Sequence, residues 1–381
     1  MAPAPRRGFR ASFREVLPVW AVLRGALFLV LYYARISFGE RFGPTSKPWV
    51  AFPQNRFLDS LARWDSGWYS TIVENGYSYS GPMRESNVAF FPAYPMLAKA
   101  LAPLFPNHFA AGLFVSNVAF LLGLVVLHRW VEESFDARHA RRAVLLMLLY
   151  PTTVFFSAYY TESLFLLEAV TAFYCYSREN YLGAGLAGAF ASGTRSTGIM
   201  LLPAFALGEI VKLVRARRWP TLRWTGARLP LLLIPVGLVL YMLFLKQKFG
   251  DPLVFSKVQA AWGRTFGNNP LSVLQAQWLR FENEPWERGE VVGSALCVAV
   301  LVLSVPKLDA AGLFFASVGT LLPLTTGMVA SELRYFSTAI PLLPLLAVYT
   351  RHPGVRFTVY ALFGAMAALT TARFALWFWA G

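Results

Sequence analysis

Charged residues are scarce in this chain of 381 residues, at 14%, against roughly 25% in an ordinary soluble domain. Hydrophobic residues make up 56% of the sequence and aromatic residues 16%. This composition excludes an ordinary soluble domain and predicts a membrane protein. Acidic residues are fewer than basic ones, so the net charge is +15. The basic residues gather in short segments between apolar runs, as in cytoplasmic loops, and we therefore expect no nucleic-acid partner.

Cysteine and histidine are too few and too scattered for a metal site or a disulfide framework. Cys175 and Cys297 lie in apolar segments, and no two of the four histidines have ligand spacing on one helix face. The chain has no glycine-rich phosphate loop, and none of its five aspartates forms an Asp-x-Asp pair. We predict that no metal or cofactor takes part and that arginine holds any phosphate-linked substrate.

The apolar runs predict an all-α polytopic membrane protein with about nine to eleven transmembrane helices, each span needing roughly 20 residues. The expected crossings lie at about 16–36, 109–127, 143–157, 160–176, 182–193, 197–211, 229–245, 291–305, 310–328, 336–350 and 357–379. Arginines before the first run predict an N-terminus in the cytoplasm, and the count places the C-terminus outside. We expect residues 1–381 to form a single transmembrane domain.

Two long segments are expected on the extracytoplasmic side, 37–108 and 246–290. The first contains RWDSGWYSTIVENGY at 63–77, which predicts a helix from about Phe57 to Val73. One face of that helix would carry Phe57, Leu61, Trp64, Trp68 and Ile72. A helix with tryptophans on its apolar face belongs in the headgroup layer of a membrane. Asp65 would therefore lie at the outer membrane surface.

The same topology brings three more charged residues to the outer face. The short runs between 143 and 211 predict two tight hairpins, with Glu162 near the tip of the first and Arg195 near the tip of the second. Arg334 precedes a later crossing. A carboxylate beside arginines suits a phosphate-bearing ligand, because guanidinium groups bind phosphate through paired hydrogen bonds.

Simpler interpretations of these residues remain open at this stage. Glu162 and Arg195 would pair with each other and join the two hairpins, and Arg334 would be an interfacial anchor. Asp65 would only stabilise its helix. Glu74 would be a helix-end residue, with Gly76 as the terminator.

Three sequence blocks resemble the PIG-V family of mannosyltransferases, which have the glycosyltransferase C (GT-C) fold. The first is RWDSGWYSTIVENGY followed by AFFPAYP, which is similar to the first outer loop of that family. The second is TTVFFSAYYTESLFLL at 152–167 followed by ASGTRSTGI at 191–199, and ELRYFSTAIPLL at 332–343 is similar but less specific. The family's eukaryotic members add the second mannose to the glycosylphosphatidylinositol (GPI) anchor. The short loops of this chain are typical of a prokaryotic-type member.

The resemblance implies that Asp65 is the catalytic residue and that Glu162 and Arg195 line the same cavity. We expect the donor to be a polyprenyl- or dolichyl-phosphate sugar, the acceptor to be a glycan or glycolipid, and membrane lipids to surround the protein. Arg195 and Arg334 would bind the donor phosphate, Asp65 would act as base, and the anomeric centre would be inverted. Further cavity residues are expected at Trp64, Trp68, Tyr69, Glu74, Tyr77 and Trp262.

Three alternatives to this function remain open. A transporter or flippase for a lipid-linked sugar would move the same ligand without chemistry. A scaffold subunit would have no activity alone. A GT-C enzyme for another sugar, such as glucose or arabinose, is the nearest alternative within the enzyme class. The membrane would be the plasma membrane in a prokaryote and the endoplasmic reticulum in a eukaryote, with the active site on the extracytoplasmic side.

Overall fold

The computed structural model describes residues 8–42, 49–217 and 219–380, and within these ranges the chain is helical with no strand. The α-helices are α1 (Phe9–Phe42), α2 (Arg56–Asp59), α3 (Ser66–Asn75), α4 (Ala93–Leu101), α5 (His108–Ser134), α6 (Ala137–Leu148), α7 (Glu162–Ser177), α8 (Tyr181–Thr194), α9 (Leu201–Ala216), α10 (Leu222–Arg228), α11 (Val236–Phe249), α12 (Val254–Lys257), α13 (Pro270–Arg280), α14 (Pro285–Ser304), α15 (Ala310–Leu321), α16 (Glu332–Phe336), α17 (Leu342–Tyr349) and α18 (Pro353–Ala375). Short 3₁₀ turns connect them: η1 (Asn87–Ala89), η2 (Ala102–Leu104), η3 (Thr153–Phe156), η4 (Ser196–Met200), η5 (Leu229–Leu233), η6 (Val258–Trp262), η7 (Val305–Lys307) and η8 (Leu324–Thr326).

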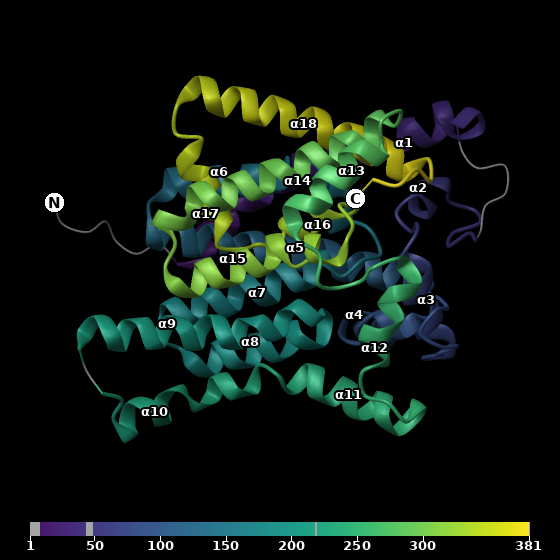
Figure 1. Ribbon diagram of the computed structural model, residues 1–381. Helices are drawn as coiled ribbons and strands as arrows, with labels where there is room; N and C mark the ends of the chain where they lie inside the picture. The colour runs from purple at the N-terminus through teal and green to yellow at the C-terminus, as the bar shows by residue number, and fades with distance from the viewer. Residues whose placement is uncertain (1–7, 43–48, 218, 381) are drawn as a thin grey trace.

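The long helices lie roughly side by side, and the short helices α2, α3, α4 and α12 gather at one end of them (Figure 1). Helix α5 packs along α6 and α7, and α7 packs along α8. Helix α9 packs on α15, and α1 packs on α5 and α18. The core between them is mainly aromatic and aliphatic, with Phe120, Phe156, Phe165 and Phe205 fully or almost fully buried. The bundle therefore presents one end formed by helix termini and outer segments.

Five helical segments are long and apolar enough to cross a membrane, namely Phe9–Gly39, His108–Ser134, Ser196–Ala216, Pro285–Lys307 and Pro353–Ala375. A sixth arises if Leu222–Leu233 and Val236–Phe249, bent by 45° at their junction, form one broken span. The other expected crossings are helical but short: α6, α7 and α8 have 12, 16 and 14 residues. At about 1.5 Å per residue they do not reach through a hydrocarbon layer of about 30 Å alone.

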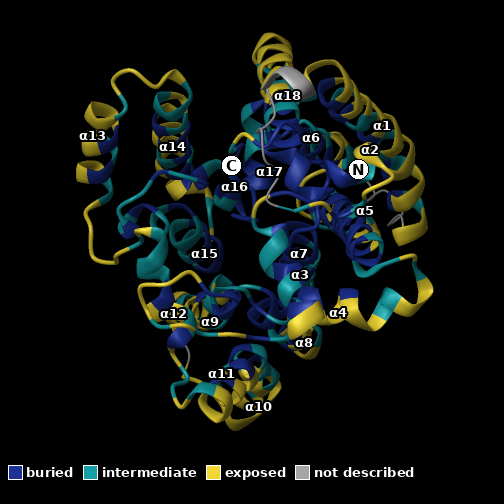
Figure 2. Cartoon of the chain, turned by 90° about the vertical axis from the view of Figure 1, so that its right-hand side faces the viewer, coloured by how far each residue is buried: buried dark blue, intermediate teal, exposed yellow. Residues whose placement is uncertain are grey.

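Apolar side chains cover the outward faces of the long peripheral helices. Leu29 on α1, Leu240 on α11, Leu296 on α14 and Leu362 on α18 are each more than half exposed. Figure 2 shows exposed faces along α1 and α18 around a buried centre that contains α7 and α17. An apolar surface of this extent is unstable in water and is the surface that lipid chains cover. The chain is a polytopic membrane protein, as the composition predicts.

The predicted helix from Phe57 to Val73 is wrong, because the structure breaks it into α2 and α3. The backbone of Trp64 is left-handed, with φ of 52°, and α3 begins only after Asp65. The residues of the expected apolar face therefore do not share one environment, since Ile72 is fully buried and Trp64 is 37% exposed. The break places Asp65 at the N-terminal edge of a helix rather than in the middle of one.

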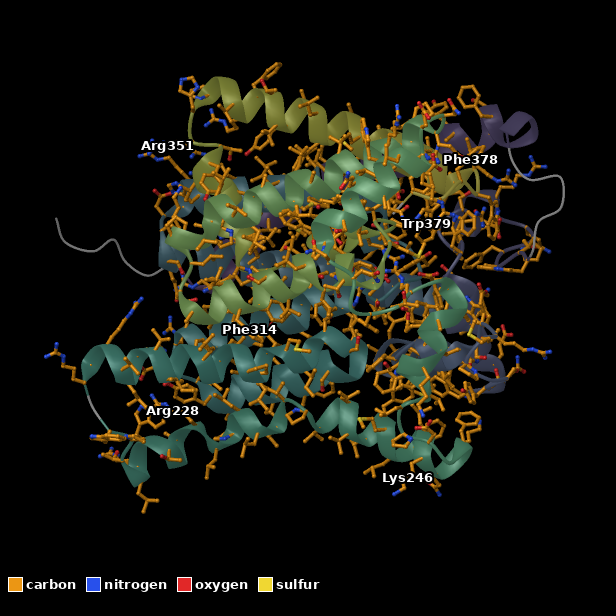
Figure 3. All side chains as sticks on the ribbon, in the orientation of Figure 1. Arg228, Lys246, Phe314, Arg351, Phe378 and Trp379 are labelled. Atoms are coloured by element: carbon orange, nitrogen blue, oxygen red, sulfur yellow. The ribbon has the colours of Figure 1, made fainter. Side chains whose placement is uncertain are left out.

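The chain turns where both hairpins were expected, but the helices on either side of each turn pack mainly on other helices, with α6 on α5 and α17 and α9 on α15. The first turns through η3 and the residues before α7, and the second turns between α8 and η4. The first outer segment starts later than expected, since α1 continues to Phe42, and its residues 43–48 lie outside the described ranges. The second is shorter than 246–290, since α11 continues to Phe249 and α14 starts at Pro285. Figure 3 places Arg228 and Arg351 at the end of the bundle opposite Trp379.

Glycine allows close contact between α8 and the η5–α11 segment. A Cβ on Gly185 would clash with the Pro230 carbonyl oxygen, which is backbone and has no freedom to rotate away. Small residues let helix backbones approach in membranes. We therefore expect Gly185→Ala to lower the stability by about 1–3 kcal/mol through overpacking. Thermal unfolding in detergent measures this loss. Gly226→Ala is the control, because nothing lies within 4 Å of its added Cβ, and an equal effect of both substitutions would contradict the packing argument.

Candidate active site

A buried arginine shapes the turn that carries Asp65. Arg63 is fully buried, donates to the carbonyl oxygens of Asp59 and Ala62, and pairs with the Asp59 carboxylate at 2.9 Å. Asp59 Oδ1 also accepts from the Ala51 amide at 2.9 Å. These bonds use the carbonyl groups that a continuous helix would need at this point. They explain why the chain turns at Trp64 and why Asp65 lies at the start of α3.

Tyr160, at the tip of the first hairpin, fixes the other side of the turn. Its hydroxyl donates to the Arg63 carbonyl at 3.0 Å and accepts from the Asp65 amide at 3.1 Å. Tyr160 is 1% exposed, so water does not replace either bond. The position of the Asp65 backbone is therefore determined by a residue almost a hundred positions later in the chain.

We expect Tyr160→Phe to lower the stability by about 1–3 kcal/mol, because it leaves a buried N–H and a buried carbonyl without partners. Thermal unfolding in detergent measures the loss. Tyr174→Phe is the matched control, since the Tyr174 hydroxyl donates to Glu133 at an exposed site. Equal stability of the two variants would show that the Tyr160 hydroxyl does not hold the turn.

The four charged residues predicted at the outer face form one ionic cluster. Arg334 Nη1 lies 3.0 Å from Asp65 Oδ2, and Arg334 Nε lies 3.3 Å from Glu162 Oε1. Arg195 Nη1 donates to the same Glu162 oxygen at 3.0 Å. Glu162 is the first residue of α7, and Arg195 directly follows α8. The pairing of Glu162 with Arg195 that was left open is therefore present, together with a link to Asp65.

The burial of this cluster decides between two interpretations of Arg334. The Arg334 side chain is 7% exposed and the Glu162 side chain 1%, whereas Asp65 is 23% exposed. An interfacial anchor would extend its guanidinium into water or headgroups, so that interpretation is wrong. Burial alone would lower the pKa of Arg334, but Glu162 and Asp65 outweigh it and raise that pKa well above its usual range. Arg334 therefore stays protonated.

A cavity of about 590 Å³ opens beside this cluster. Its walls come from the first outer segment, the hairpin tips at Glu162 and Arg195, the second outer segment, and α15 and α16. Six of the predicted site residues line it: Asp65, Tyr69, Glu162, Arg195, Trp262 and Arg334. Residues far apart in the sequence thus form one cavity, as the topology predicted.

Four other predicted cavity residues do not line it. Trp64 packs edge-on against Trp377 and Trp379, with ring centres 6.1 and 5.5 Å apart. Trp68 stacks on Phe90 and lies behind the wall that Phe90 forms. Both tryptophans therefore make ring contacts outside the lining of the cavity.

The remaining two lie at the far end of α3. Glu74 accepts from Ser70 at 3.0 Å and lies 3.4 Å from His108, half exposed. Gly76, with φ of 74°, ends the helix after Asn75, so Glu74 lies in the last turn, as in the simpler interpretation. The Tyr77 ring is buried, and its hydroxyl donates to the Phe90 carbonyl at 2.9 Å.

Sequence reasoning missed Arg264 and Tyr335, which also line the cavity. The Tyr335 ring is contacted by Arg334, Arg195 and Arg264, whose guanidinium carbons lie 5.3, 5.4 and 5.5 Å from its centre. Burial alone would raise the pKa of Tyr335, but the positive charges of Arg264, Arg334 and Arg195 outweigh it and lower that pKa. Arg264 lies in the expected second outer segment, 246–290, and Tyr335 lies in the block ELRYFSTAIPLL, but neither residue was assigned a role from the sequence.

No three His, Cys, Asp or Glu side chains within the described ranges are placed to hold a metal ion together. The cluster beside the cavity offers two carboxylates, and arginine occupies both. That no metal or cofactor takes part stays a prediction.

Solved structures with a similar architecture identify the fold. The chain aligns with ArnT from Cupriavidus metallidurans, solved with undecaprenyl phosphate, at a TM-score of 0.54 and 15% identity, over 92% of this chain and 64% of that one. It aligns with an oligosaccharyltransferase from Archaeoglobus fulgidus in the apo form at a TM-score of 0.53 and 14% identity, over 95% of this chain and 56% of that one. The fold is that of the GT-C glycosyltransferases.

The sequence is similar to one mannosyltransferase family over part of its length. Residues 38–213 match the family described as "Mannosyltransferase (PIG-V)". The chain is 30% identical to GPI alpha-1,6-mannosyltransferase 2 of Cricetulus griseus over 56% of this chain and 47% of that protein. It is 33% identical to GPI mannosyltransferase 2 of Yarrowia lipolytica over 36% of this chain and 37% of that protein. The chain therefore spans less than half the length of these relatives.

Proposed function

We propose that this protein transfers a mannosyl unit from a polyprenyl- or dolichyl-phosphate donor to a hydroxyl group of an extracytoplasmic acceptor, with inversion. The observation that carries the proposal is the contact of Asp65 with Arg334 and, through it, with Glu162, at the wall of a cavity of about 590 Å³. The family match at 38–213 contains Asp65, Glu162 and Arg195 and supports mannose as the sugar. The likeness to a relative of the GPI pathway supports a glycolipid or glycan acceptor.

The residues supply what a single displacement needs. Asp65 takes the proton of the acceptor hydroxyl while the acceptor oxygen forms a bond to the anomeric carbon. The bond from that carbon to the phosphate oxygen breaks, and its electron pair leaves with the lipid phosphate. Arginine charge stabilises the phosphate as its negative charge grows. No protonation of the leaving group is required, because the departing phosphate is a stable anion.

The contacts of the second carboxylate support inversion. A retaining enzyme uses a carboxylate about 5 Å from the first as nucleophile. Glu162 is the only other acid in the cavity wall as the structure describes it, and its Oε1 is bound by both Arg195 and Arg334. A carboxylate held by two guanidinium groups is a poor nucleophile, which favours direct attack by the acceptor.

The position of the cavity supports an extracytoplasmic site. It lies at the end of the bundle formed by the outer segments, whereas Arg228 and Arg351 mark the opposite end (Figure 3). By the positive-inside rule, the loops with Arg228 and Arg351 belong in the cytoplasm. The membrane is the plasma membrane for a prokaryotic source and the endoplasmic reticulum for a eukaryotic one.

The test is turnover of a panel of polyprenyl-phosphate sugars by the purified protein in detergent, followed by mass spectrometry of the lipid. The expected result is conversion of the mannosyl donor to polyprenyl phosphate, with the glucosyl and arabinosyl donors left intact. Turnover of only the glucosyl or arabinosyl donor would contradict mannose. Flux of the lipid-linked sugar across proteoliposomes without any glycosidic product would support the transporter or flippase instead.

A further inference from the structure

Three guanidinium groups surround the Tyr335 ring, but two of them are already neutralised. Arg195 pairs with Glu162 at 3.0 Å, and Arg334 pairs with Asp65 at 3.0 Å and with Glu162 at 3.3 Å. Two arginines thus face two carboxylates. An anion that binds Arg195 or Arg334 must compete with a carboxylate that is already in place.

Arg264 is different, because its hydrogen-bond acceptors are neutral. Its Nη1 donates to Thr326 Oγ1 at 2.9 Å, and its Nη2 donates to the Ala330 carbonyl at 3.0 Å. Within the described part of the chain it forms no ion pair. Arg264 therefore contributes a positive charge that the cavity wall does not balance.

The acidic residue that attracts Arg264 is Glu332, but no ion pair joins the two side chains among the described residues. Glu332 is 2% exposed, and neither of its carboxylate oxygens has a hydrogen-bond partner among the described residues. Burial raises the pKa of Glu332 well above its usual range, and the attraction of Arg264 does not offset this. Among the described residues Glu332 forms neither an ion pair nor a hydrogen bond with Arg264, so the Arg264 guanidinium stays available to a ligand.

The surroundings of Arg264 combine this charge with apolar side chains. Phe266, Leu322 and Met328 line the same cavity. Tyr335 links Arg264 to the ionic cluster, since its ring lies 5.5 Å from the Arg264 guanidinium and 5.3 Å from that of Arg334. The contacts thus run from Arg264 through Tyr335 and Arg334 to Asp65. A ligand whose anionic group lies at Arg264 and whose reacting centre lies at Asp65 fits this arrangement.

We propose that Arg264, assisted by the Tyr335 hydroxyl, is the phosphate-binding group for the lipid donor. The isoprenoid chain lies along Phe266, Leu322 and Met328, and the sugar lies toward Asp65. Arg334 and Arg195 then chiefly hold the two carboxylates in place, which revises their predicted role as the donor-phosphate ligands. The identity of the ligand in this assignment rests on the proposed function. The distribution of charge around Tyr335 is independent of that function.

The experiment measures binding of undecaprenyl phosphate to the full-length protein in detergent. We expect Arg264→Gln to weaken binding about tenfold to a hundredfold, the effect of losing hydrogen bonds to a charged partner. Arg264→Lys should restore part of the affinity, because it keeps the charge but not the planar fork. Arg280→Gln removes the same charge from an exposed position of the second outer segment and should bind as the wild type does. Wild-type affinity in Arg264→Gln would overturn the proposal.

Further binding measurements separate recognition of the phosphate from other causes of a lower affinity. Thr326→Val removes a hydrogen-bond partner of Arg264 but keeps the charge of Arg264, so this variant should retain most of the affinity for undecaprenyl phosphate. A loss of affinity equal to that of Arg264→Gln would mean that the attachment of the loop, and not the charge of Arg264, determines binding. Undecaprenol lacks the phosphate, and its binding should not change in Arg264→Gln. Competition by phosphatidylglycerol at equal concentration would identify an ordinary headgroup site and overturn the proposal.

Failure of the Arg264 assignment can be distinguished from failure of the proposed function. Binding of undecaprenyl phosphate that depends on Arg264, in a protein that transfers no sugar, would contradict the proposed function and leave this assignment standing. Sugar transfer by the wild type, together with normal binding of undecaprenyl phosphate by Arg264→Gln, would support the proposed function and contradict the role of Arg264.

Discussion

Asp65→Asn is expected to reduce mannosyl transfer by about 10²–10⁴-fold, the usual contribution of a general base. Asparagine has nearly the shape of aspartate but does not take up the proton of the acceptor hydroxyl. Arg334 keeps its contact with Glu162, so its charge does not become unpaired. We therefore expect the variant to insert, fold and bind undecaprenyl phosphate. The measurement is the initial rate of product formation from the mannosyl donor at saturating acceptor.

Glu85→Gln is the matched control for this change. Glu85 lies in the same outer segment, is exposed, and does not line the cavity. Its neutralisation should leave the rate unchanged. A rate near that of the wild type in Asp65→Asn, with Glu85→Gln also active, would remove Asp65 from the mechanism.

Arg334→Gln is expected to lower the free energy of unfolding by about 3–5 kcal/mol, because removing one member of a buried ion pair leaves the other charge unpaired. Arg334 joins the Asp65 carboxylate of the first outer segment to Glu162 of the hairpin. Transfer activity should be lost as well, since Arg334 no longer holds the Asp65 carboxylate in position. Thermal unfolding in detergent, with activity measured at a temperature where the variant is folded, separates the two effects.

The double variant Arg334→Gln with Asp65→Asn tests the cause of the instability. Removing the carboxylate that Arg334 leaves unpaired should recover part of the lost stability. Arg178→Gln is the control, because Arg178 pairs with Glu133 at an exposed site, and exposed pairs add little. Additive losses in the double variant would show that the charges of Arg334 and Asp65 do not stabilise each other.

The ionic cluster could be predicted from the sequence because it follows from topology. Hairpin length and basic loops decide which ends of the helices meet, and Glu162 and Arg195 are placed by that alone. Their bonding partners were not predictable, since a distance of 3.0 Å between Arg334 and Asp65 depends on packing across most of the chain. The sequence thus predicts which residues belong to the cluster but not which of them pair with each other.

The turn at Trp64 shows a limit of periodicity. The apolar spacing from Phe57 to Ile72 fits one helix, and nothing local to it signals a break. The break depends on Arg63, which is fully buried and donates to two backbone carbonyl groups, and on Tyr160 from a distant hairpin. Tertiary hydrogen bonds outweigh a local pattern in this case.

Arg264 was missed for a related reason. It lies in a segment with no periodic pattern, among several other basic residues, and the sequence does not show which of them lacks a carboxylate partner. The distinction appears only when the partners of Arg195, Arg334 and Arg264 are compared in space.

The most direct test of the account is an electron cryo-microscopy structure of the protein with a non-transferable analogue of a polyprenyl-phosphate mannose. We predict density for the analogue in the cavity beside Asp65, with its phosphate within about 3 Å of the Arg264 guanidinium. The anomeric carbon should lie between that phosphate and the Asp65 carboxylate. Density for the analogue at a site that contacts neither Asp65 nor the arginines around Tyr335 would contradict a glycosyl-transfer site in this cavity.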